Sequence, residues 1–252
     1  MAHRSQKAAC LILFLALPIG VRAAELQFPV RHSRLLWDDA GTLTVNESGI
    51  AYRETGGKGD KQDGGLNQWT WAFGEIQQLY LSPERIKVLS YQDRKWHLGV
   101  DHEFLFHLAP GTDVQPLYEF LKARMNSRLV AALPEKVVNP LWESPAKLMG
   151  TVVGSQGVLR FGERRAVFET GREEQSRTWR YEDIENISSA GSYQITLTVR
   201  ERAKAQYGSL KAFNFQLKQP LEGKQFDSLW RRLNQDNQLP FLTAIQEGKP
   251  GK

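Results

Sequence analysis

The stretch Trp-Ala-Phe-Gly-Glu-Ile at residues 71–76 returns later in the chain as Trp-Arg-Tyr-Glu-Asp-Ile at residues 179–184. Two shorter stretches return in the same order: Lys-Trp-His-Leu-Gly at 95–99 as Lys-Ala-Gln-Tyr-Gly at 204–208, and Phe-His-Leu at 106–108 as Phe-Gln-Leu at 215–217. The chain of 252 residues is long enough for two domains of ordinary size. We therefore predict two related copies of one domain.

Each copy is predicted to open with a β-hairpin of the same register. Apolar residues alternate with polar ones on both sides of a turn rich in polar residues, so that pairing the strands places the apolar side chains on one face. The expected pairs are Val45 with Ile50, Leu43 with Tyr52, Phe161 with Ala166 and Leu159 with Phe168.

Further strands and a closing helix follow in each copy. Trp69, Trp71 and Phe73 share one face of a predicted third strand, and alternating apolar residues continue to Leu108. We place turns at 92–94 and 99–101, which brings the total to about seven strands. Helices are expected at 113–128 and 222–235, where apolar residues recur three and four positions apart.

These patterns divide the chain into five segments. Residues 1–23 have the charged start, short apolar run and small residues before a cleavage site that are typical of a secretory signal peptide, and the alternative is an uncleaved anchor. The first domain is predicted at 25–129, a proline-containing linker at 130–144, the second domain at 145–237, and a disordered tail at 238–252. An exported, periplasmic or extracellular protein is expected.

Seven short antiparallel strands followed by one amphipathic helix, twice over, resemble the pleckstrin-homology-like (PH-like) superfold, and the bacterial PH and GRAM-like domains in particular. The aromatic strand that runs into an acid-Ile turn at 71–76 and 179–184 carries this resemblance, together with the closing helices. It implies a mainly β (α+β) fold of two seven-stranded β-barrels or sandwiches, each closed by its C-terminal helix. It also implies a non-enzymatic domain that binds peptides, proteins or lipid headgroups through loops at its open end, although a shared superfold does not determine an activity.

Composition excludes several classes of protein. Removing the three basic residues of 1–23 leaves 30 basic against 28 acidic residues, which lacks the concentrated positive charge of a dedicated nucleic-acid binder. The single cysteine, Cys10, lies within the signal, so the remainder has neither disulfides nor thiolate chemistry.

Three groups of residues could form a functional site, but each is better interpreted as ordinary structure. His97, His102 and His107 are close in sequence, but the predicted register places His97 opposite Glu103 and His107 opposite Asp93, which gives separate acid–His pairs rather than a metal site or a hydrolase base. Tryptophans 69, 71 and 96 are expected in the core rather than on a sugar-stacking platform. The glycine-rich stretch 56–65 is expected to be a flexible loop rather than a calcium-binding repeat. We therefore expect no catalytic residues, cofactor or metal.

Charge is divided unevenly between the two halves. Residues 25–143 carry a net charge of −3 and residues 144–252 a net charge of +5. Arg160, Arg164 and Arg165 flank the first hairpin turn of the second copy, and we single them out as partner-binding residues. The excess positive charge of the second copy has three possible interpretations: it binds an anionic partner or surface, it docks on the acidic first copy, or it forms a plain solvated face. The functional prediction is an exported interaction module that binds a protein, peptide or anionic surface; the alternative is an enzyme or small-ligand carrier with a site between the copies.

Overall fold

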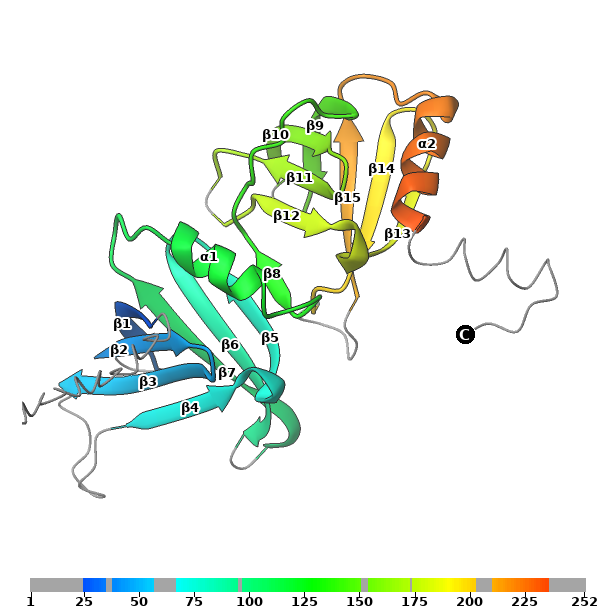
Figure 1. Cartoon of the computed structure of the whole chain (residues 1–252). Helices are drawn as coiled ribbons and strands as arrows, with labels where there is room; N and C mark the ends of the chain where they lie inside the picture. Colours follow the sequence, from blue (N-terminus) through cyan, green and yellow to red (C-terminus); the bar gives the residue numbers. More distant parts are fainter. Residues whose placement is uncertain are drawn as a thin grey trace, which may run out of the picture.

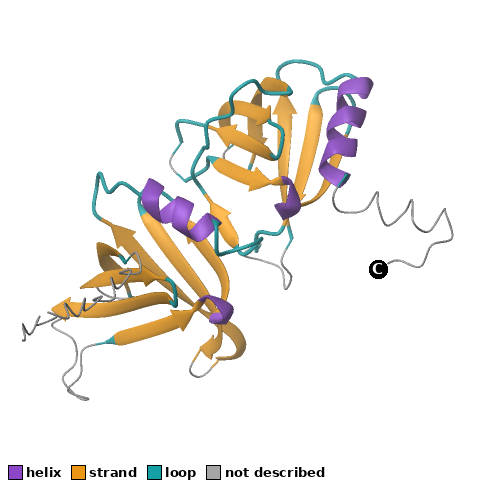
Figure 2. Cartoon of the chain, viewed as in Figure 1, coloured by secondary structure: helices purple, strands orange, loops and turns teal. Residues whose placement is uncertain are grey.

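The computed structural model describes residues 25–34, 38–56, 67–94, 97–150, 154–172, 174–202 and 210–235. These residues form a mainly β protein with two α-helices (Figures 1 and 2). The first copy contains β1 (Leu26–Ser33), β2 (Asp38–Asn46), β3 (Gly49–Gly56), β4 (Gln68–Ala72), β5 (Ile76–Leu81), β6 (Arg85–Arg94), β7 (His97–Leu108) and α1 (Gln115–Lys122). The second contains β9 (Trp142–Met149), β10 (Ser155–Phe161), β11 (Arg165–Glu169), β12 (Arg177–Arg180), β13 (Ile184–Ser189), β14 (Gln194–Val199), β15 (Lys211–Leu217) and α2 (Gly223–Asn234).

The two copies have the same strand order. Neighbouring strands run β4-β3-β2-β1-β7-β6-β5 in the first copy and β12-β11-β10-β9-β15-β14-β13 in the second. Each fourth strand enters a one-turn 3-10 helix, η1 (Phe73–Glu75) or η2 (Tyr181–Asp183). The carboxylate at the end of that turn accepts a hydrogen bond from a backbone N–H three residues earlier, Ala72 to Glu75 and Arg180 to Asp183. The repeated motif of the sequence is therefore this corner.

The corner keeps each sheet open. Because the 3-10 turn redirects the chain between the fourth and fifth strands, β4 does not pair with β5, and β12 does not pair with β13. All described strands instead belong to one continuous open sheet. The prediction of two closed barrels is therefore wrong, whereas the mainly β class is confirmed.

Each copy packs its own hydrophobic core. Trp71 contacts the rings of Phe104 and Phe106 and is almost fully buried. Trp179 occupies the same position in the second copy and packs edge-on against Phe213 and Phe215. Both tryptophans are therefore core residues, which confirms the prediction for Trp71.

The predicted register of both opening hairpins is confirmed. Val45 faces Ile50 and Leu43 faces Tyr52, while Phe161 faces Ala166 and Leu159 faces Phe168. A glycine in each hairpin, Gly41 or Gly157, allows close approach of the following strand, since a Cβ atom there would overlap an aromatic ring and a backbone carbonyl.

The sequence interpretation missed the first strand of each copy. β1 lies ahead of the hairpin with which the first copy was predicted to open, and β9 begins inside the predicted linker. Each contains a proline, Pro29 facing Thr42 and Pro145 facing Val158, and proline is depleted in strands because it lacks an N–H donor. Pro29 is tolerated because pairing of β1 with β7 begins only at Val30.

Two predicted turns are wrong. β6 runs through 92–94 and β7 runs through 99–101, and Arg94 at the end of β6 pairs with His97 at the start of β7. The register of this hairpin places His107 opposite Arg85 and Asp93 opposite Asp101. The predicted pairs of His97 with Glu103 and His107 with Asp93 are therefore wrong.

The closing helices bury the expected apolar faces. Leu117 and Leu121 of α1 and Leu229 and Leu233 of α2 lie in the cores. α1 ends at Lys122, six residues before the predicted end, and the chain then forms β8 (Leu129–Ala131).

Strand β8 joins the two copies. It pairs in parallel with β5, Leu79 facing Leu129, and antiparallel with β12, Thr178 facing Ala131 (Figure 1). The predicted linker 130–144 thus contributes residues to β8 and to β9, and both cores are connected through one sheet.

Several predictions fall on residues that the structure does not describe. They are the signal peptide at 1–23, most of the loop at 56–65, Trp96, and the whole of the tail at 238–252. In the part of the chain that is described, neither helix has the length and apolar character needed to cross a membrane.

Candidate interaction site at the junction of the copies

The three predicted arginines make different contacts. Arg160 lies on β10, where its guanidinium contacts the carboxylates of Glu143 and Glu169. Arg165 begins β11 and pairs with Glu135 of the connecting segment. Arg164 is exposed in the turn, and its side chain has no ion-pair partner among the described residues. Of the three, Arg164 is thus the one whose charge is left for a partner.

Arg164 lines an open groove of about 860 Å³. The groove lies between the hairpin turn of the second copy, the η2 corner, the C-terminal end of α2, the end of α1 and the connecting segment. We call it the basic groove, because five cationic side chains line it against three carboxylates: Lys122, Arg164, Arg165, Arg180 and Arg232 against Glu135, Glu163 and Glu182.

Most charges of the basic groove are already paired. Glu135 accepts contacts from Lys122, at 2.6 Å, and from Arg165. Arg180 contacts Glu182 at 2.6 Å and Asp183 at 2.9 Å. Arg164 and Arg232 are the groove cations that have no carboxylate partner among the described residues. Sequence reasoning missed Arg232, which comes to the groove only because α2 ends beside η2.

Two buried tyrosines fix the walls of the basic groove. The Tyr181 hydroxyl donates a hydrogen bond of 2.6 Å to the Gly162 carbonyl, which ties the η2 corner to the hairpin turn. The Tyr118 hydroxyl donates one of 2.6 Å to Glu135. Burial raises the pKa of both hydroxyls to about 12, so they remain protonated donors at neutral pH.

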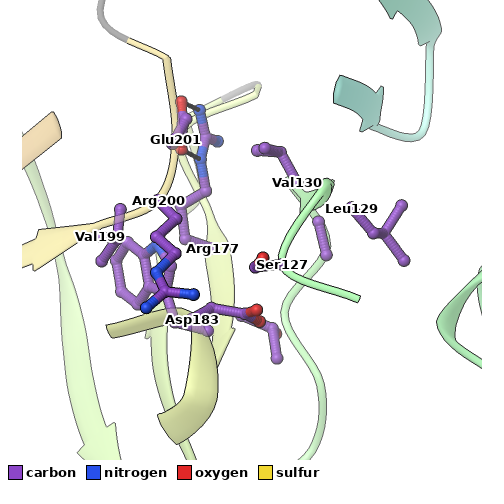
Figure 3. Close-up of a pocket in the computed structure, with 11 residues that line it drawn as sticks. Ser127, Leu129, Val130, Arg177, Asp183, Val199, Arg200 and Glu201 are labelled. Carbon is purple, nitrogen blue, oxygen red and sulfur yellow. Dashed lines mark hydrogen bonds and ion pairs between the residues drawn. The ribbon is translucent and has the colours of Figure 1, made fainter. Parts of the chain in front are cut away.

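A buried ionic cluster joins the start of β12 to the segment that follows β14 (Figure 3). The Arg177 guanidinium contacts both oxygens of Glu201, at 3.2 and 3.3 Å, and Lys211 contacts Glu201 at 2.6 Å. Burial alone would raise the pKa of the Glu201 carboxyl, but the attraction of Arg177 and Lys211 outweighs it and lowers that pKa. The pair is therefore ionised and held by charge-assisted hydrogen bonds.

Beside this cluster lies a small void of about 10 Å³. Ser127 and Leu129 line it from the connecting segment, and Trp179 and Asp183 from the second copy (Figure 3). Its volume is about that of one water molecule. The indole N–H of Trp179 is buried without a partner in the described structure, and a single water molecule would satisfy it.

Glu174 connects the second copy to the first. Its carboxylate contacts Arg85 at 3.1 Å and Ser82 at 3.2 Å, and its carbonyl accepts a hydrogen bond from Tyr80. Glu174 has φ of 58°, an unusual conformation for a residue other than glycine. Arg202 makes a second connection, to Asp101 at 2.8 Å. Across the junction, the first copy supplies the cation of one ion pair and the second copy supplies the cation of the other. The net charges of the two halves did not indicate this arrangement.

The sequence also offered two alternatives, a metal site at the histidines and a sugar-stacking platform at the tryptophans. Among the described residues there is no group of three side chains placed to hold a metal ion. Trp69 is half-buried and stacks on Tyr52, with ring centroids 5.3 Å apart. His32, which the sequence interpretation did not single out, lies 4.9 Å from the Trp69 ring in the same aromatic cluster.

Comparison with known proteins adds little. No family model matches the chain, and no curated protein is significantly similar to it. Among solved structures, a chain from "Structure of the Spt16D Pob3N heterodimer" matches at 16% identity with a TM-score of 0.30, covering 78% of this chain and 98% of that chain. Similarity at this level carries no argument about function.

Proposed function

We propose that this protein is an exported, non-enzymatic interaction module of two PH-like domains, and that its basic groove binds an anionic group of a partner protein. The single observation that carries the proposal is the position of Arg164 and Arg232, which line one open groove without a carboxylate partner among the described residues. Guanidinium groups form bidentate contacts to carboxylates.

The PH-like assignment is supported by the strand order of each copy, seven antiparallel strands followed by a helix. Export is supported by residues 1–23 alone, and N-terminal sequencing of the mature protein is its test. We expect cleavage after Ala23 or Ala24, and a protein that still begins at Met1 would refute the cleaved signal and remove this support for export.

A binding role is better supported than the rival, an enzyme or ligand carrier with a site between the copies. β8 and β12 line a void at the junction of the copies. This void has room for about one water molecule. The larger grooves are open and lined mainly by paired charges. A partner surface suits such grooves better than an enclosed small molecule does.

The test compares binding of an acidic probe, poly-glutamate, by the wild type and by Arg164→Gln/Arg232→Gln. We expect about a tenfold weaker Kd for the variant, equivalent to 1.4 kcal/mol, and weaker binding by both proteins as salt rises. The matched control is Arg31→Gln/Arg53→Gln, which removes two exposed charges from the first copy.

Equal binding by the groove variant and the wild type would refute the proposal, as would an equal loss in the control. Binding of vesicles that contain anionic lipid, without binding of poly-glutamate, would assign the groove to a membrane surface instead.

A further inference from the structure

The outer edge of β5 in the first copy is occupied by another strand. β8 lies along it in parallel, with Leu79, Tyr80 and Leu81 facing Leu129, Val130 and Ala131. The Leu79 N–H donates to the Arg128 carbonyl at 2.8 Å, and the Leu81 carbonyl accepts from the Ala132 N–H at 2.8 Å. The edge of β5 is thus a binding site for an extended segment. In the first copy that segment is β8, which the protein itself supplies.

β13 is the counterpart of β5 in the second copy. Both strands follow a one-turn 3-10 helix, and both have a register irregularity at the same point, Ile76–Gln78 in β5 and Ile184–Asn186 in β13. Ile187 and Ser189 correspond to Leu79 and Leu81. Their backbone groups therefore face outward, yet no described strand pairs with this edge of β13.

The helix beside β13 is also less covered than its counterpart. The apolar spacing of the helices matches Val114 with Phe226 and Tyr118 with Trp230. Val114 and Tyr118 are buried in the first copy, whereas Phe226 and Trp230 are only partly buried in the second. An unpaired strand edge beside partly exposed aromatic side chains is a typical surface for binding of an extended peptide.

The first copy also shows what such a segment contains. Leu129 and Ala131 enter the core, and Val130 is buried as well. The guanidinium of the preceding residue, Arg128, donates to the carbonyls of Phe73 and Ile76 at the 3-10 corner, at 2.8 and 3.0 Å. The corresponding carbonyls of the second copy belong to Tyr181 and Ile184.

We propose that the outer edge of β13 binds an extended segment of a partner protein in which an arginine precedes three apolar residues, the last of them small, and that this segment adds to the sheet in parallel with β13. The arginine would reach the η2 corner, and the apolar residues would cover Phe226 and Trp230. This site shares the η2 corner with the basic groove but includes neither Arg164 nor Arg232.

The test uses a synthetic peptide, Asn-Ser-Arg-Leu-Val-Ala-Ala-Leu, which has the sequence of residues 126–133. Amide hydrogen exchange of the intact protein is measured by NMR with and without the peptide. We expect protection to rise at Ile187 and Ser189, whose amides face outward, and to stay constant at Asn186 and Ser188, because protection should follow the period of two of a strand.

Two peptide variants test the chemistry. Proline in place of the peptide's valine removes a backbone donor and should abolish protection. Glutamine in place of its arginine should weaken binding about tenfold, equivalent to 1.4 kcal/mol. On the protein, Trp230→Glu should weaken binding, and a thermal melt of this variant tests whether it remains folded.

Three results would overturn the proposal. The first is unchanged exchange at Ile187 with the peptide present. The second is protection without peptide that disappears from a chain ending at Gln235, because the chain's own C-terminal residues would then occupy the edge. The third is protection without peptide that rises with protein concentration, which would make the partner a second copy of this protein.

Discussion

Lowering the pH from about 7.5 to about 5 should destabilise this protein through one buried imidazole, that of His32. This side chain is 8% exposed and is surrounded by the rings of Tyr52, Trp69, Phe104 and Phe106. Its Nδ1 atom is buried without a hydrogen-bond partner in the described structure. Burial, together with repulsion from Arg34, lowers the pKa of His32 from 6.5 to about 4.

The sign and size of the effect follow from this pKa. The unfolded chain binds a proton at His32 as the pH falls below about 6.5, whereas the folded protein does not do so until the pH approaches about 4. Stability is therefore full above pH 6.5 and is lost as the pH falls toward 4. The complete loss is about 3 kcal/mol, and about 2 kcal/mol of it is present at pH 5.

The assay is urea unfolding at both pH values for the wild type, His32→Gln and His107→Gln. Each protein is compared with itself, so that the cost of the substitution at neutral pH cancels. We expect His32→Gln to lose about 2 kcal/mol less than the wild type between the two pH values. His107→Gln is the matched control, since His107 lies outside the aromatic cluster. A pH dependence that is the same for His32→Gln and the wild type would refute the argument.

Three further predictions test the cores and the junction by denaturant unfolding. Trp71→Ala and Trp179→Ala should each cost about 3–5 kcal/mol, and a loss below about 1 kcal/mol would contradict their place in the cores. Gly157→Ala should cost about 1–3 kcal/mol because its Cβ would overlap the Glu169 carbonyl, whereas Gly171→Ala, with open space around it, should be nearly neutral; similar losses in both would remove the steric argument. Glu201→Gln leaves a buried guanidinium with its charge unpaired and should cost about 3 kcal/mol at neutral pH, and a neutral result would show that the cluster contributes no net stability.

Local pattern predicted the parts of the fold that short-range rules determine. The hairpin pairs followed from alternation, the buried tryptophans followed from parity, and the helix faces followed from spacing. β1 and β9 were missed because Pro29 and Pro145 argue against strands, and only the register of pairing shows that they are tolerated. The closed barrels were wrong because the opening at η1 and η2 depends on chain direction, which composition does not encode.

The candidate site was less predictable than the fold. The sequence places Arg160, Arg164 and Arg165 around one turn, but the carboxylates of Glu143 and Glu135 that neutralise two of them come from segments that precede the hairpin and pair only after folding. Charge counts over half of the chain could not show this, because ion pairing depends on side chains within about 4 Å. Arg232 was missed because it is far from the hairpin turn in sequence and reaches the groove only through the packing of α2 beside η2.

Strand β8 has a consequence for how this protein is made. It is synthesised directly after the first copy and before any strand of the second, so that once it has paired with β5 its other edge is ready when residues 142–217 emerge from the ribosome. The second copy would then fold against a template, with Thr178 meeting Ala131 and the Leu133 carbonyl. The order of the two copies along the chain therefore matters for folding. In a circular permutant that presents the second copy first, the second copy would have to fold before β8 is available as a template.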